Sequence, residues 1–141
     1  MIQRIQSIWL LLSALCTGFV FLIPLATGNE LQRLFVYGLV KDGHVLAEKS
    51  FLWGFALACT LLPLTVIFQF RKRPRQIRMI WLIALLNAVL NALALFEIFR
   101  LPDYRFSTGI IFLPVSFILL IMAVMAIRKD EKLVRSADRL R

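Results

Sequence analysis

The sequence predicts an all-α integral membrane protein, a four-transmembrane-helix bundle that forms one domain over residues 1–141. Hydrophobic residues make up 60% of the chain and charged residues only 18%, whereas soluble domains are about 45–50% apolar. The apolar residues gather in four long runs instead of short alternating segments. The net charge is +9, and the basic residues cluster just outside these runs, as they do in cytoplasmic loops of membrane proteins.

Each apolar run is long enough to cross a bilayer. The runs cover residues 8–25, 51–70, 79–99 and 110–127. At a rise of 1.5 Å per residue, such lengths match a hydrocarbon core of about 30 Å. A cleaved signal peptide is the alternative for the first run, because Arg4 and the small residues after the run imitate its layout. The length of the run favours a retained helix.

Lys and Arg residues are divided unevenly between the two ends of the runs. They are concentrated in the basic loop 71–78 and the tail 128–141, with Arg4 at the N-terminus, and they are sparser in the external segment 27–50 and the connection 100–109. This bias predicts that both termini are cytoplasmic. The side chains expected to contact anionic lipid headgroups or a protein partner on that side are Arg71, Lys72, Arg73, Arg75, Arg78, Arg128, Lys129, Leu133, Ala137 and Leu140.

The external segment contains a β-hairpin pattern. Residues 34–40 and 44–47 are rich in β-forming side chains, and Asp42-Gly43 between them is a strong hairpin turn signal. We expect a small β-hairpin at the outer membrane-water interface. An isolated hairpin is marginally stable in water, so it should pack against the helix ends or against a partner.

The third run carries a small and polar face. Asn87 and Asn91 are four residues apart and share one side of the helix, with Ala84 and Ala88 on an adjoining strip. Small residues let helices approach closely, and side-chain amides bond across the interface. Helix packing is therefore the expected role of this face, and a polar transport path is the alternative.

Glu97, near the end of the third run, is predicted to form an interfacial ion pair with Arg100, three residues further on. The fourth run is predicted to continue as a helix into the cytoplasm, because Leu133, Ala137 and Leu140 recur at helical spacing. That apolar stripe would lie on the membrane surface, fold under the bundle against the basic loop, or dock on a partner.

Familiar catalytic and ligand-binding patterns are not found in the sequence. No metal-ligand spacing and no phosphate-binding glycine loop occurs, and His44 is the single histidine. We therefore expect no enzyme activity, no cofactor and no nucleic-acid partner. An enzyme acting on lipid would need Glu97, Asp103 or His44 to converge at the outer interface.

Four features of the chain occur together in a known family: the opening residues 1–7, the basic second loop with Gln76, Asn87 in the third run, and the ending at 130–141. In these features the chain resembles a family of bacterial membrane proteins grouped as domain of unknown function 4293. Pro74 departs from the family's loop pattern. The resemblance implies a four-helix protein of the inner membrane of a Gram-negative bacterium, and it implies no activity.

Two functional hypotheses follow from these features. The first is a non-enzymatic accessory or scaffold subunit of a membrane complex, which contacts membrane lipid and either a protein partner or a second copy of itself. The second is a small oligomeric transporter or channel that uses the helix face of Asn87 and Asn91.

Overall fold

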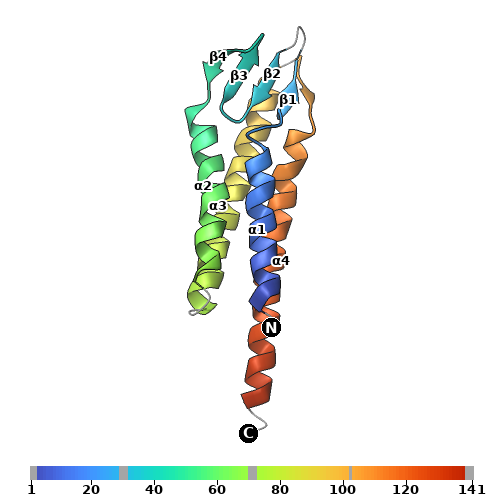
Figure 1. Ribbon diagram of the computed structural model, residues 1–141. Helices are drawn as coiled ribbons and strands as arrows, with labels where there is room; N and C mark the ends of the chain where they lie inside the picture. The colour runs from blue at the N-terminus through green and yellow to red at the C-terminus, as the bar shows by residue number, and fades with distance from the viewer. Residues whose placement is uncertain (1–2, 29–31, 70–72, 102, 139–141) are drawn as a thin grey trace.

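The computed structural model describes residues 3–28, 32–69, 73–101 and 103–138. Four helices run alternately up and down as one elongated bundle (Figure 1). They are α1 (Gln3–Phe19), α2 (Ser50–Ile67), α3 (Arg73–Phe99) and α4 (Gly109–Asp138). Each helix packs against its neighbours in chain order, and α4 closes the ring against α1.

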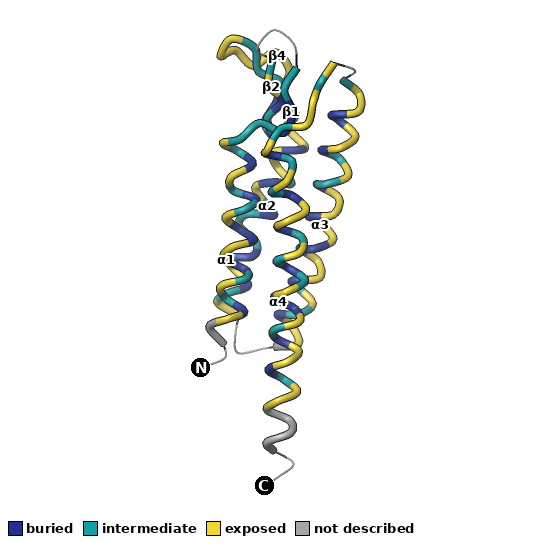
Figure 2. The backbone as a smooth tube through the Cα atoms, turned by 90° about the vertical axis from the view of Figure 1, so that its right-hand side faces the viewer, coloured by how far each residue is buried: buried dark blue, intermediate teal, exposed yellow. Residues whose placement is uncertain are grey.

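Buried positions on each helix alternate at spacings of three and four residues, which is the pattern of knobs-into-holes packing. Figure 2 shows the resulting stripes of buried and exposed backbone along the four helices. On α3 the buried stripe contains Gln76, Ile80, Ile83, Asn87, Leu90, Ala94 and Glu97. Polar residues thus share the interior stripe with apolar ones.

Three of the described helices are long and apolar enough to cross a membrane: residues 50–67, 74–99 and 109–133. The apolar helix at 5–19 is shorter. Many large apolar side chains on all four helices are exposed, among them Leu15, Leu61, Leu85 and Ile118. Apolar helices with apolar outer surfaces indicate a multi-pass membrane protein.

Helix α1 ends at Phe19, six residues before the end predicted for the first span. The N–H groups of residues 20–23 still bond back to Thr17, Gly18 and Phe19 as turns, and the backbone groups from Pro24 onward bond elsewhere. Leu25 donates its N–H to the Leu34 carbonyl at 2.7 Å and accepts from the Ser107 N–H at 3.0 Å, while the Pro24 carbonyl accepts from the Gly109 N–H at 3.1 Å. The chain therefore leaves the helix to join the sheet and the start of α4.

Helix α3 begins at Arg73, so most of the predicted basic loop 71–78 is helical. Pro74 explains the difference, because proline fits the first turn of a helix, where its missing N–H has no intrahelical partner to lose. Arg75 and Arg78 lie on the first turns of the helix. Helix α2 also differs slightly from prediction, since it ends at Ile67.

One antiparallel sheet covers the end of the bundle where α1 ends and α2 begins (Figure 1). Its order is β4-β3-β2-β1-β5. The strands are β1 (Ala26–Thr27), β2 (Arg33–Phe35), β3 (Gly38–Lys41), β4 (His44–Glu48) and β5 (Arg105–Phe106). The α1–α2 and α3–α4 connections both contribute strands to this sheet, because β5 comes from the α3–α4 connection and pairs with β1. Leu34 and Val36 share a core cluster with Leu52, Leu90 and Leu113.

The predicted hairpin is present as β3 and β4, with Asp42 at φ 49° and Gly43 at φ 83° in the turn. Positive φ at both central residues is the geometry that Asp-Gly favours. The predicted first strand, residues 34–40, is wrong as one element: it divides into β2 and β3 at a turn formed by Val36 and Tyr37. Val36 is fully buried there, which draws the chain towards the helices.

Candidate functional site

The central polar layer consists of Ser13 and Thr17 on α1, Asn87 and Asn91 on α3, and Ser116 on α4. Ser13 and Ser116 place their hydroxyl oxygens 2.9 Å apart, and Asn87 Nδ2 donates to Ser116 Oγ at 3.1 Å. Asn91 Nδ2 donates to Asn87 Oδ1 at 2.9 Å and to the Asn87 carbonyl at 2.8 Å. Hydrogen bonds thus run from α1 through α4 to α3.

Thr17 connects this layer to the remaining helix. Its hydroxyl donates to the Cys59 carbonyl of α2 at 3.3 Å, and also contacts the Ser13 and Ala14 carbonyls of its own helix. Sequence reasoning singled out the asparagines and missed Ser13, Thr17 and Ser116. Their spacing along the interior stripes of α1 and α4 is the signal that could have found them.

The predicted small-residue strip lies only partly on the interior. Ala84 is buried among the residues packed around Ile80 and Leu120, whereas Ala88 is exposed. Ala88 therefore does not contribute to packing within this bundle. A step of one residue turns a helix by about 100°, and this step carries Ala88 from the interior stripe of Asn87 to the outer surface.

The central polar layer is made of hydroxyl and amide groups, so it carries no charge that titrates near neutral pH. Ser13, Thr17, Asn87 and Ser116 are fully buried. Asn87 faces the centre of its own bundle, so a path between copies of the chain would not be lined by it. The arrangement is suited to holding four helices in one register.

Replacing Asn87 by leucine is expected to destabilise the bundle by about 1–2 kcal/mol, because Ser116 and Asn91 each lose a buried partner. Unfolding in detergent with increasing SDS, followed by tryptophan fluorescence, measures the change. Ala88→Leu on the adjacent exposed position serves as the control and should stay near the parent value. Equal stability of the Asn87 variant would contradict a structural role for the layer.

Glu97 forms an ion pair with Lys49, with Nζ and Oε2 2.7 Å apart. The predicted partner, Arg100, instead places its guanidinium over the Phe96 ring at 4.3 Å. Lys49 directly precedes α2 and Glu97 lies in the last turn of α3, so this pair connects two helix ends on the side of the bundle that carries the sheet. The Glu97 side chain is only 7% exposed, which makes its partner important.

At the opposite end of the bundle, Arg75 and Arg78 line an open pocket of about 400 Å³ with Gln69, Met79 and Leu82. Two guanidinium groups beside apolar side chains suit an anionic headgroup and the upper part of its acyl chain. Arg128, Lys129 and Leu133 are exposed on α4. Arg71, Lys72 and Leu140 lie outside the described residues, as do the side chains of Arg73 and Ala137.

The residues that a lipid-directed enzyme would need do not lie together. His44 is in β4 at one edge of the sheet, and Asp103 is two residues before β5 at the other edge. Four strand spacings of about 4.8 Å separate these edges. Within the described part of the chain, no group of three His, Cys, Asp or Glu side chains could hold a metal ion.

These features define a small helical bundle with the apolar surface of a multi-pass membrane protein and a sheet over one end. The chain belongs to the family described as Domain of unknown function (DUF4293), whose model matches residues 2–140. This match confirms the resemblance seen in the sequence. Neither the curated proteins nor the solved structures contain a match to the chain.

Proposed function

We propose that this protein is a non-enzymatic accessory or scaffold subunit of a bacterial inner-membrane complex, and that the end of α4 binds a cytoplasmic protein. Both termini lie in the cytoplasm in this proposal. The positive charges at the end of the bundle opposite the sheet support this orientation, because basic residues are retained on the cytoplasmic side. The pocket of Arg75 and Arg78 would then meet anionic headgroups of the inner leaflet.

The observation that carries the proposal is the length and continuity of α4. The helix runs without interruption from Gly109 to Asp138 and passes the first turn of α1 (Figure 1). Its 30 residues span about 45 Å, against a hydrocarbon core of about 30 Å. No glycine or proline follows Pro114 in it, so nothing in its sequence favours a bend.

This continuity favours one of the three expected destinations of the tail. Lying on the membrane surface and folding under the bundle both require a bend after the membrane-spanning part, whereas docking on a partner requires none. Arg128, Lys129 and Lys132 are exposed on this segment. Their charge favours a partner with an acidic surface.

The test is purification from native membranes in mild detergent, with mass spectrometry of the proteins that accompany the chain. We expect a stoichiometric partner with the full chain and at least about tenfold less of it when the chain ends after Lys129, since the docking helix is then lost. A second copy of the chain as the sole companion would replace the partner by self-association. Recovery of the chain alone in both forms would contradict the proposal.

A matched control separates the helix from its general basic charge. Replacing Arg75 and Arg78 by glutamine removes two positive charges from the same end of the bundle and leaves α4 unchanged. We expect this variant to retain the partner. Loss of the partner equal to that of the truncated chain would show that the basic surface, and not α4, is recognised.

A further inference from the structure

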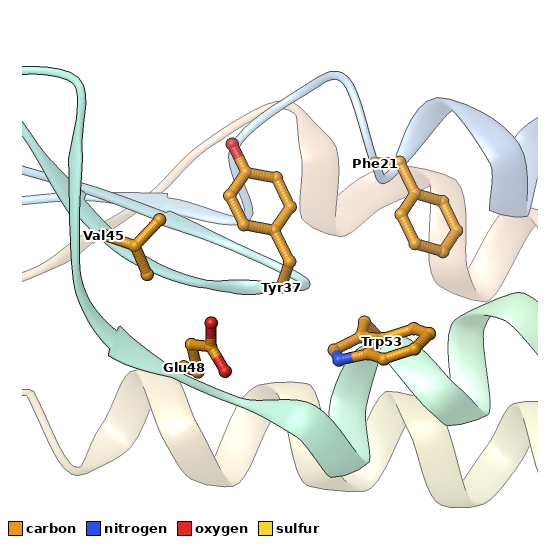
Figure 3. A pocket seen from close by; sticks show the side chains of 5 residues that line it. All are labelled: Phe21, Tyr37, Val45, Glu48 and Trp53. Atoms are coloured by element: carbon orange, nitrogen blue, oxygen red, sulfur yellow. The ribbon is translucent and has the colours of Figure 1, made fainter.

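A second open pocket lies at the opposite end of the molecule from the pocket of Arg75 and Arg78, between the sheet and the helix ends (Figure 3). It is lined by Phe21 after α1, Tyr37 and Val45 from the sheet, Glu48 at the end of β4, and Trp53 in the first turn of α2. Its volume is about 290 Å³, at the lower end of the range of ligand pockets, roughly 300–1,000 Å³. A small polar headgroup fits this size.

The single acidic side chain in the pocket is available to an external cation. Glu48 is exposed, and Figure 3 shows its carboxylate directed into the space between Tyr37 and Trp53. The neighbouring Lys49 is already paired with Glu97 at 2.7 Å. Among the residues that the structure describes, no ion pair joins Glu48 to a basic side chain.

The walls of the pocket favour a positively charged ligand, as the Glu48 carboxylate does. Three aromatic rings, those of Phe21, Tyr37 and Trp53, line it, and the faces of aromatic rings attract cations. A carboxylate accepts strong hydrogen bonds from an ionised donor. A group that carries both positive charge and N–H donors, a primary ammonium, therefore satisfies the carboxylate and the rings together.

The outer surface of α2 indicates where that ammonium comes from. Trp53, Leu57 and Leu61 follow one another at spacings of four residues and are 43%, 42% and 50% exposed. They form an apolar track that leads from the pocket along the membrane-facing side of the helix. A phospholipid places its headgroup at this level and its acyl chains along such a track.

We infer that this pocket binds the primary ammonium of a phospholipid headgroup, as in phosphatidylethanolamine, with Glu48 as its hydrogen-bond acceptor and Trp53 as its main aromatic wall. The site lies at the opposite end of the bundle from the proposed protein contact of α4, so the two are independent. Binding here would fix the height of the sheet against the lipid surface.

Native mass spectrometry of the full chain in detergent tests the site with equal amounts of phosphatidylethanolamine, phosphatidylcholine and phosphatidylglycerol. We expect phosphatidylethanolamine to be retained most. Glu48→Gln should lower its retention about tenfold, the loss that accompanies removal of a charge-assisted hydrogen bond. Trp53→Leu, which keeps an apolar side chain but removes the ring, should lower it severalfold.

Asp42→Asn is the matched control, because it removes a carboxylate from the same hairpin outside this pocket, and asparagine tolerates the positive φ of that position. It should bind lipid as the parent does. Equal retention of the three lipids, or no effect of Glu48→Gln, would overturn the inference. Displacement of the lipid by an equal concentration of free ethanolamine would overturn the assignment to a lipid.

Discussion

Replacing Gly109 by alanine is expected to destabilise the protein by about 3 kcal/mol, near the upper end of the usual cost of overpacking. Gly109 begins α4 where it touches the chain after α1. A Cβ at this position would overlap the Pro24 carbonyl oxygen and lie 2.7 Å from the Ile23 carbonyl oxygen. Both are backbone atoms, which cannot rotate aside as a side chain can. SDS-induced unfolding in detergent measures the loss.

Gly54→Ala is the control for this substitution. Gly54 lies inside α2, and a Cβ there would meet no atom within 4 Å. Alanine has the higher helix propensity, so this variant is expected to gain about 0.5–1 kcal/mol. If both variants shifted stability in the same direction, the close approach of α4 to residues 23–24 would not be what limits position 109.

Replacing Lys49 by alanine is expected to cost about 2–3 kcal/mol, because it leaves the buried Glu97 carboxylate without its cation. This cost is at or below the loss of about 3–5 kcal/mol for fully buried pairs, since the Lys49 side chain is 27% exposed. Glu97 lies at the C-terminal end of α3, where the helix dipole also disfavours a negative charge. The same unfolding measurement detects the change.

The double variant Lys49→Met with Glu97→Leu identifies the cause. It removes both charges and restores apolar packing, so we expect stability close to that of the parent. Lys129→Ala, which removes an exposed cation from α4, should have no measurable effect. A double variant as unstable as Lys49→Ala would indicate that the methylene groups of Lys49, and not its charge, stabilise this end of the bundle.

The number and type of the helices were predictable because each depends on a local apolar run. The turn at Asp42 and Gly43 was predictable for the same reason, since two adjacent residues determine it. The end of α1 was not. It depends on the hydrogen bonds of Leu25 with Leu34 and Ser107, and one of these partners lies far along the chain.

In the candidate sites, too, residues with a local signal in the sequence were predictable and their distant partners were not. Asn87 was identified because a mid-membrane amide stands out in the sequence, but its partner Ser116 is one ordinary serine among several. The predicted pair of Glu97 with Arg100 followed from local spacing, whereas the true partner, Lys49, lies on another element. The pocket of Figure 3 draws residues from the segment after α1, from the sheet and from α2, and no single stretch of sequence brings these together.

The pairing of β1 with β5 has a consequence for the order of folding. Strands β2, β3 and β4 follow one another closely, so they can pair as soon as residues 33–48 are synthesised. The partner of Ala26 in β5 is Phe106, which is made only after α3 is complete. Contacts so distant in sequence form late, because the intervening chain must first be ordered. Strand β5 therefore pairs with β1 and completes the sheet only once α3 has returned the chain to the same side of the membrane.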